Sequence, residues 1–433
     1  MKAVIGIRRE DKNEWERRAP LTPDQVESLI RVHGIEVCVQ PSEQRIFSDD
    51  AYRRAGATLE EDLSRCQTVL AIKEIPLDFY QERKTYLFFS HTIKGQAHNM
   101  PILKRMMAKR CQLIDYERIV DDQGRRLVLF GRHAGLAGMI ENLVGLGQRL
   151  AAEGIANPFT ELKAPHQYAD LDEAKAHLGT IGQRIAAEGL PETIVPCVVG
   201  ILGYGNVARG VQEILDCLPA EEVQPQMLSR LPRSNRVLYT VVFREEDTVE
   251  PIDPSSHFSL PDYFRNPERY RATLSRNLPY LTLVVNAVYW EKRFPRLIRR
   301  EDLESLYRQP KRPTLRVIGD ITCDVEGAVE ITRKATTPGE PCYTYDAATD
   351  RLVDGVRALL GPVVMAVDNL PCEFPAESSK DFGLALLPFL PAIARADFCG
   401  SFEAVELPEP IRKAAILHQG RLTPTYRYLE PYL

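Results

Sequence analysis

The chain has 433 residues, is 44% hydrophobic and 27% charged, and carries a formal net charge of −5. This length predicts two or three domains, and the composition is that of an ordinary globular protein. The negative net charge argues against a nucleic-acid-binding surface, and no apolar run reaches the roughly 20 residues of a membrane helix. We therefore expect a cytoplasmic protein with neither nucleic-acid nor membrane partners.

The nine cysteines are scattered along the chain, and none forms a C-x-x-C pair. No set of cysteine and histidine residues has the spacing of a zinc site. An odd, dispersed number of cysteines without a signal peptide indicates a reducing cytosol. The sequence therefore predicts no metal site.

The first part of the chain alternates strand and helix patterns. Strand patterns occur at residues 3–7, 35–39, 68–72, 86–89 and 112–116, and a helix pattern lies at residues 102–109. Thr22, Pro23 and Gln25 have the spacing of an N-cap, a first-turn proline and a capping box, and Gly34 closes this helix. Such alternation favours a largely parallel sheet with helices on both faces.

Residues 198–202 form an apolar strand pattern that leads directly into a glycine-rich turn and a helix. The turn has the pattern Gly-x-Gly-x-x-Ala and consists of Gly203, Tyr204, Gly205, Asn206, Val207 and Ala208. Gly203 would allow the tight turn, Gly205 the approach of a pyrophosphate, and Ala208 close packing of the helix on its strand. The free N–H groups of the helix would then bind the phosphates. The alternative is a strand-to-helix turn that binds nothing.

The patterns around this turn predict the domain organisation. A long helix pattern at residues 135–153 connects the two halves, and strand patterns at 237–243, 281–288, 316–322 and 363–367 extend a second parallel sheet. A polar, proline-rich insertion lies near residues 251–276, and the last helix pattern, at 378–393, is too short to form its own domain. We expect a discontinuous substrate domain, residues 1–134 plus 372–433, and a dinucleotide-binding domain, residues 135–371.

The cofactor preference depends on the second strand after the turn. NAD-specific folds carry an acidic residue about 20 positions beyond the glycines. We expect this strand near residues 222–224, and no acid stands at its end. Arg230, Arg233 and Arg236 follow, where they would meet a 2′-phosphate, so the sequence favours NADP, with NAD as the alternative. These arginines are otherwise the charges of a solvated loop.

Four candidate site residues follow strand patterns, and ligands of open α/β folds bind at the carboxyl ends of strands. Histidine as a residue type has an unperturbed pKa near neutrality, which makes His91 the candidate for general acid–base catalysis. Lys73 can transfer protons if neighbouring cations lower its pKa. Alternatively, His91 is a hydrogen-bonded structural histidine and Lys73 is a surface lysine. Asp320 and Asp324 would contact the cofactor ribose or a substrate ammonium, and turn capping is their alternative.

Short motifs then follow one another in a characteristic order. They are Arg17-Arg18-Ala19-Pro20, Ile72-Lys73-Glu74, Ser90-His91-Thr92-Ile93-Lys94-Gly95, Gly203-Tyr204-Gly205-Asn206-Val207, Tyr289-Trp290-Glu291, Asp320-Ile321-Thr322-Cys323-Asp324 and Val367-Asp368-Asn369-Leu370-Pro371. This series resembles the lysine–ketoglutarate reductase half of the bifunctional aminoadipate-semialdehyde synthases. It is similar, more distantly, to the lysine-forming saccharopine dehydrogenases and to the alanine dehydrogenase/transhydrogenase family. The resemblance covers residues 2–433.

The resemblance implies an α/β fold of two Rossmann-like, doubly wound domains that face each other across a cleft. It implies an oxidoreductase of lysine metabolism that condenses L-lysine with 2-oxoglutarate and reduces the imine with NADPH to saccharopine, or catalyses the reverse. Lys73 and His91 would be the catalytic groups, and Glu74 would orient Lys73. Arg18 and Lys94 would bind substrate carboxylates, since fixed cations suit that task.

Two other functions remain open at this point. One is an opine-type or amino-acid dehydrogenase with a different pair of amine and keto acid, and the other is a catalytically idle, nucleotide-binding regulator. The joint presence of Arg18, Lys73 and His91 argues against the regulator. The expected partners are the small substrates, a separate glutamate-forming saccharopine dehydrogenase, because the resemblance does not include that half, and a second copy of the chain.

Overall fold

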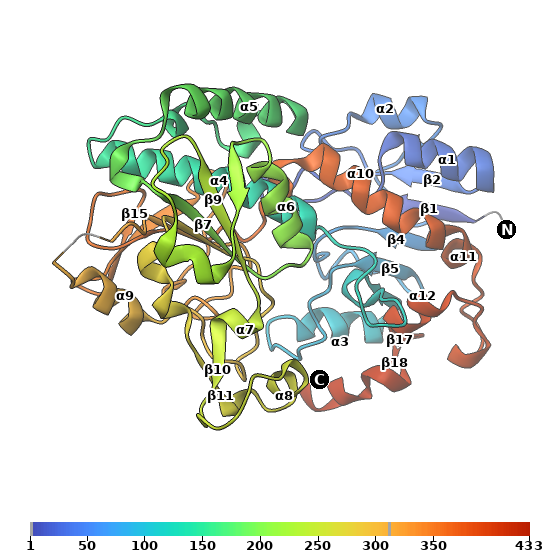
Figure 1. The fold of residues 1–433 in the computed structure, drawn as a ribbon. Helices are drawn as coiled ribbons and strands as arrows, with labels where there is room; N and C mark the ends of the chain where they lie inside the picture. The colour runs from blue at the N-terminus through green and yellow to red at the C-terminus, as the bar shows by residue number, and fades with distance from the viewer. Residues whose placement is uncertain (1–2, 311–312) are drawn as a thin grey trace. The chain divides into compact units, whose positions relative to one another are not determined.

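The computed structural model describes residues 3–310 and 313–433 and divides the chain into two compact units (Figure 1). The first unit consists of Met1–Phe130 and Pro375–Leu433, and the second consists of Gly131–Phe374. The first unit is therefore discontinuous in sequence, with the whole second unit between its two parts. No helix in the described residues is both long enough and apolar enough to cross a bilayer.

The first unit is built on an eight-stranded sheet of order β18-β17-β6-β5-β4-β1-β2-β3. Strands β1 to β6 run parallel, β17 is antiparallel to β6, and β18 is antiparallel to β17. The direction of strand addition changes between β1 and β4, and this is where open α/β sheets bind ligands. The strands are β1 Val4–Ile7, β2 Glu36–Val39, β3 Thr58–Leu59, β4 Thr68–Leu70, β5 Thr85–Phe88, β6 Gln112–Asp115, β17 Ala415–His418 and β18 Arg421–Leu422.

The first helix of this unit shows how local sequence defines an element. Thr22 caps α1 and accepts a hydrogen bond from the Gln25 N–H, and the capping box is complete. Gly34 ends the helix at φ 65°, a left-handed conformation that favours glycine. The predicted caps are thus confirmed. The helices are α1 Pro23–His33, α2 Asp49–Arg54, α3 Met100–Ala108, α10 Pro375–Leu386, α11 Leu390–Arg395 and α12 Glu409–Ala414.

The second unit is built on another eight-stranded sheet, of order β15-β14-β16-β13-β12-β7-β9-β8. The six strands β8, β9, β7, β12, β13 and β16 run parallel to one another. The hairpin β14–β15 is antiparallel to β16 and forms one edge of the sheet. These strands are β7 Cys197–Leu202, β8 Ala220–Glu222, β9 Leu238–Phe243, β12 Leu283–Asn286, β13 Val317–Asp320, β14 Cys342–Asp346, β15 Arg351–Asp354 and β16 Val363–Met365.

Helices cover both faces of this second sheet. Val199 and Ile201 of β7 pack into one core with residues of α4, α5 and α6, and Val198 and Leu202 point into a core on the opposite face. This alternation gives the doubly wound arrangement that the sequence predicts. The helices are α4 Gly131–Ala152, α5 Leu171–Glu188, α6 Asn206–Leu215, α7 Glu245–Thr248, α8 Leu260–Arg265 and α9 Arg300–Tyr307.

The structure adds detail to three local expectations. The strand expected near residues 222–224 is β8, a three-residue strand at the sheet edge, and β9 lies between it and β7. The helix predicted at residues 378–393 is divided into α10 and α11, because Pro388 and Pro391 lack the N–H groups that a continuous helix requires. The predicted insertion contains a small two-stranded sheet of its own, β10 Val249–Pro251 with β11 Tyr270–Ala272.

Glycines bring the backbones of α4 and α6 into direct contact. A Cβ atom added to Gly135 would overlap the carbonyl oxygen of Val207, and one added to Gly210 would overlap the carbonyl oxygen of Arg132. The longest helix of the second unit is thereby fixed against the helix that follows the glycine-rich turn.

Gly135→Ala is therefore expected to destabilise the protein by on the order of 1–3 kcal/mol, because the helices must separate to admit a methyl group. Urea unfolding measures the change. Gly179→Ala, in α5, is the matched control, since a Cβ atom there has no neighbour within 4 Å. The control should be stabilised by up to about 1 kcal/mol through helix propensity. Equal effects of the two substitutions would contradict the close helix contact.

Candidate functional site

The glycine-rich turn lies at the carboxyl end of β7. Gly203 has φ +93°, and a side chain there would meet Val288 Cγ1 at 2.9 Å, so this position requires glycine. Gly205 precedes the first residue of α6, and a Cβ atom added to it has no neighbour within 4 Å. The turn thus offers open space in front of the N–H groups at a helix N-terminus, which fits a pyrophosphate.

Two residues that sequence reasoning missed lie beside this turn. Arg244 and Glu245 follow β9, and the Arg244 guanidinium lies 4.7 Å from the centre of the Tyr204 ring. The Tyr204 hydroxyl donates a hydrogen bond to Glu245 Oε2 at 3.2 Å. Together with Gly203 and Phe243 they line one pocket. They were missed because the residue that sets the cofactor preference was sought at the end of the strand near residues 222–224 and not at the end of β9.

The predicted arginine loop lies elsewhere. Arg236 Nη1 donates to the carbonyl oxygen of Ala186 at 2.9 Å, and Arg233 pairs with Glu192 at 3.3 Å. Both arginines precede β9, which runs parallel to β7, so they lie at the amino edge of the sheet, roughly 20 Å along the strands from the glycine turn. Arg233 therefore lies at the sheet edge opposite the glycine turn. Arg230 is exposed at the end of the 3-10 helix η5, Pro225–Arg230.

Asp320 is fully buried at the end of β13, with a set of internal hydrogen bonds. Its Oδ1 accepts from Asn286 Nδ2 at 2.8 Å and from Thr322 Oγ1 at 2.9 Å, and its Oδ2 accepts from Thr332 Oγ1 at 2.6 Å. The Cys323 N–H also points to Oδ1, at 3.3 Å. Burial raises the pKa of Asp320, and these hydrogen bonds oppose the rise. The geometry favours the structural alternative, a carboxylate that caps the turn and joins β12 to β13.

In the first unit, Glu10, Lys73 and His91 follow the neighbouring strands β1, β4 and β5. Glu10 accepts hydrogen bonds from the N–H groups of Ile72 and Lys73 at 2.6 and 3.0 Å, and so fixes the backbone that carries the lysine. Burial, reinforced by the negative charge of Glu16, raises the pKa of Glu10 to about 7 despite these hydrogen bonds. Sequence reasoning missed Glu10, although it follows its strand just as Lys73 does.

His91 forms a pair with Glu74, 2.6 Å from its Nδ1 to the Oε1 of the carboxylate. Lys12 Nζ lies 2.8 Å from the other oxygen of Glu74. Burial alone would raise the pKa of Glu74, but the hydrogen bonds from His91 and Lys12 hold it well below its usual range. The ionised carboxylate favours a proton on Nδ1, so Nε2 of the neutral ring is the proton acceptor. The His91 side chain keeps 40% of its surface exposed, and Asn99 Nδ2 donates to the His91 carbonyl at 2.8 Å.

Arg18 is buried and paired. Its Nε and Nη2 donate to the two oxygens of Glu16 at 2.8 and 2.6 Å, and its guanidinium lies 4.2 Å from the centre of the Phe130 ring. Lys94 is exposed, three residues beyond His91. The structure therefore gathers Glu10, Lys73, Glu74 and His91 at the carboxyl edge of one sheet, whereas the predicted carboxylate-binding arginine already has an acidic partner.

Two α/β sheets with a glycine-rich dinucleotide turn in the second unit define a class, the two-domain, pyridine-nucleotide-binding α/β proteins. Two family descriptions match the chain: "Alanine dehydrogenase/PNT, N-terminal domain" matches residues 6–137, and "Alanine dehydrogenase/PNT, C-terminal domain" matches residues 181–425. The chain belongs to the alanine dehydrogenase/PNT family.

Curated relatives place the chain more narrowly within this family. It is 38% identical over 98% of its length to the alpha-aminoadipic semialdehyde synthase of Arabidopsis thaliana, and 36% identical over 99% to the mitochondrial enzyme of Bos taurus. It spans only 41% and 48% of those two proteins. It is also 27% identical to the lysine-forming saccharopine dehydrogenase of Neurospora crassa, over 94% of this chain and 98% of that one.

Solved structures show the same fold. An L-alanine dehydrogenase matches 99% of both chains with a TM-score of 0.62 at 19% identity. The transhydrogenase from Sinorhizobium meliloti matches 97% of this chain and 100% of its own with a TM-score of 0.58 at 13% identity. The expectation of two Rossmann-like α/β domains is confirmed.

Glu10→Gln is expected to change how folding stability depends on pH. Since the folded-state pKa is raised from 4.5 to about 7, the folded protein holds a proton in this window that the unfolded chain has released. Wild-type stability therefore falls as the pH rises through the window, by at most about 1.4 kcal/mol per pH unit from this group. The variant lacks this titration, so its stability relative to wild type should increase toward the alkaline end. Urea unfolding across the window measures the difference, and a constant difference would contradict the shifted pKa.

Proposed function

We propose that the chain is an NADPH-dependent lysine–ketoglutarate reductase. The ε-amine of lysine condenses with the keto group of 2-oxoglutarate, and the imine is reduced to saccharopine; the reverse reaction uses the same groups. The observation that carries the proposal is the similarity of nearly the whole chain to alpha-aminoadipic semialdehyde synthases, at 38% identity for the Arabidopsis thaliana relative. The His91–Glu74 pair supports it, because the reaction moves protons at each step.

The proton chemistry is assigned to the carboxyl edge of the first sheet. Imine formation needs an acceptor for the amine proton and a donor to the departing hydroxyl. His91 Nε2 takes the first proton and returns it to the hydroxyl, while Glu74 holds the ring and stabilises its charged form. Lys73, whose backbone Glu10 fixes, is the second proton-transfer group. Bound NADPH would supply the hydride.

Substrate binding is assigned to Arg18 and Lys94. The two substrates together bring three carboxylates, which need fixed cations. Arg18 is held by Glu16 in a two-point ion pair, so a substrate carboxylate competes with Glu16 for the guanidinium. When the site holds no substrate, Glu16 compensates the buried charge of Arg18.

The nucleotide is assigned to the turn of the second unit, with the pyrophosphate at Gly203, Tyr204, Gly205, Asn206 and Val207. Arg244 would bind the 2′-phosphate of NADP, since it stands at the end of the strand next to β7 and is held over the ring of Tyr204. Glu245, the next residue, would instead accept a hydrogen bond from the ribose hydroxyls of NAD. The exposed Arg230 is a second candidate for the phosphate.

A panel of substrates tests the function. NADPH oxidation should require lysine and 2-oxoglutarate together. Turnover with pyruvate and ammonia instead would support an amino-acid dehydrogenase. One solved structure of the same fold is named an L-alanine dehydrogenase. Nucleotide binding without turnover on any pair would support the regulator. Product detection with a glutamate-forming saccharopine dehydrogenase as coupling enzyme would identify saccharopine.

His91→Asn is expected to lower kcat by on the order of 10²–10⁴-fold with a small change in KM, because the substitution removes a general acid–base group. The acid limb of the pH–rate profile should disappear with it. Lys73→Met should also act mainly on kcat. The exposed histidine on the same loop provides the control, His98→Asn, which should behave as wild type. A His91→Asn enzyme with the wild-type rate and profile would make this histidine structural.

Arg244→Ala is expected to weaken NADPH binding by roughly tenfold or more while changing NADH binding little, since one charge-assisted contact to phosphate contributes about 1.5–3 kcal/mol. Fluorescence titration of both nucleotides measures the ratio. Arg233→Ala is the matched control from the opposite sheet edge and should alter neither affinity. If Glu245→Gln weakens NADH and Arg244→Ala leaves NADPH unchanged, the cofactor is NAD.

A further inference from the structure

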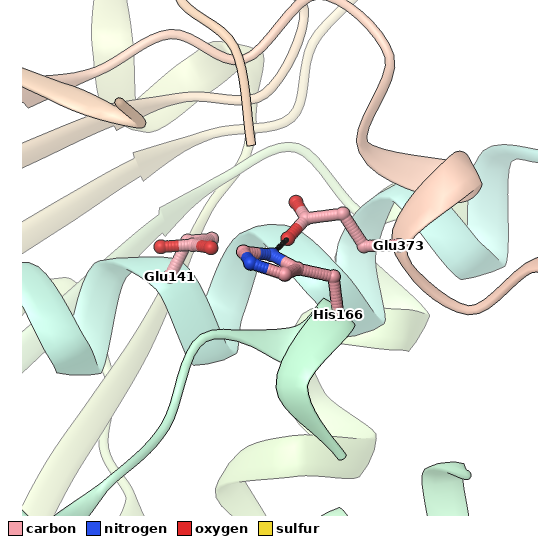
Figure 2. A group of neighbouring side chains, drawn as sticks. All are labelled: Glu141, His166 and Glu373. Carbon is pink, nitrogen blue, oxygen red and sulfur yellow. Dashed lines mark hydrogen bonds and ion pairs between the residues drawn. The ribbon is translucent and has the colours of Figure 1, made fainter. Parts of the chain in front are cut away.

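Three side chains outside the proposed reaction meet inside the second unit (Figure 2). Glu141 lies on α4, His166 on the 3-10 helix η3, Pro165–Gln167, and Glu373 on the 3-10 helix η9, Leu370–Glu373. One ligand atom from each residue lies within 4.8 Å of the other two. His166 Nδ1 is 3.2 Å from Glu373 Oε2, and the Glu141 carboxylate points toward the same ring.

The cluster carries an unbalanced negative charge when both carboxylates are ionised. Burial, followed by repulsion from Glu373, raises the pKa of Glu141 well above its usual value, and burial raises the pKa of Glu373 to about 8. Burial lowers the pKa of His166, so its imidazole is neutral near pH 7. Burial, followed by the charges of Glu141 and Glu373, raises the pKa of Cys342, so this thiol stays neutral.

The hydrogen bonding of the cluster is also incomplete. Within the described residues, both oxygens of Glu141 and Oε1 of Glu373 are buried without a hydrogen-bond donor, unless one carboxyl group is protonated and bonds to the other. A buried acceptor without a partner costs about 1–3 kcal/mol, and more if it is charged. These unpartnered oxygens therefore require either protons or a cation.

We propose that Glu141, His166 and Glu373 bind one divalent first-row transition-metal ion, with Zn²⁺ as the best match. Two carboxylates and a neutral imidazole make a neutral complex with a divalent ion. An imidazole ligand favours Zn²⁺ over Mg²⁺ or Ca²⁺. The His166 side chain is 23% exposed, so an ion can reach it from solvent. Three protein ligands leave the fourth position of a tetrahedral ion to water.

The ion joins segments that are far apart in the sequence. α4 is the first helix of the second unit, and Glu373 stands next to Phe374, the last residue of that unit. The metal thus links the start of the unit to its end and stabilises the folded state by mass action. This role is independent of the reaction proposed above.

Metal binding to the full chain tests the proposal, with Co²⁺ as a spectroscopic probe and Zn²⁺ as its competitor. Protein dialysed against a chelator should bind one Co²⁺ per chain, show visible d–d absorption and unfold at a higher temperature. Glu141→Gln and Glu373→Gln should each weaken Co²⁺ binding by on the order of 10-fold or more, since the loss of even an outer-shell partner of a metal ligand typically weakens binding by about 10- to 100-fold. His257→Asn removes an exposed histidine of the same unit and should bind as wild type.

Two results would overturn the proposal. One is a wild-type protein whose Co²⁺ binding does not saturate at one ion per chain. The other is a folded Glu141→Gln protein with the wild-type affinity for Co²⁺, and Glu373→Gln repeats this test at a second position. If the wild-type protein binds no metal and Glu141→Gln raises its Tm, the cluster is a pair of protonated carboxyl groups instead.

Discussion

The contact of backbone with backbone between α4 and α6 is the constraint on which the nucleotide site depends. Gly135 and Gly210 allow the two helices to approach until their main chains touch, and Val207, one of the residues contacted, lies in the first turn of α6. The N-terminus of α6 is the group that faces the pyrophosphate in the proposed complex. Its direction is therefore set by the packing of another helix, and the ion pair of Arg132 with Glu213 adds a second connection between the same helices.

Both units use the same physical means to place chemical groups. Parallel strands bring residues distant in sequence to one edge, where Glu10, Lys73 and His91 meet in the first unit and Gly203 and Arg244 in the second. Charge is then balanced locally: Glu74 is ionised between His91 and Lys12, whereas the more deeply buried Glu10 has a pKa near neutrality. A proton can thus be held or released at this edge close to physiological pH.

Local patterns in the sequence were sufficient for most strands, for the capped helix α1 and for the glycine turn, because each depends on residues a few positions apart. The order of strands depends on packing across the sheet, so the neighbour of β7 was not predicted and Arg244 was missed. Glu141, His166 and Glu373 illustrate the limit: they are brought together only by the fold, and no spacing along the chain marks them. The Arg18–Glu16 pair is local, but its burial against Phe130 is not.

The discontinuity of the first unit has a consequence for the order in which the protein folds during synthesis. Strand β6 pairs with β5 on one side and with β17 on the other, and β17 lies beyond the whole second unit in the sequence, so it leaves the ribosome only after that unit. Until then β6 is an open edge with unpaired N–H and C=O groups. The second unit is one continuous stretch and has all eight strands of its main sheet by Phe374. The nucleotide-binding unit is thus complete first, and the segment that follows it, Pro375–Leu433, then closes the sheet of the first unit.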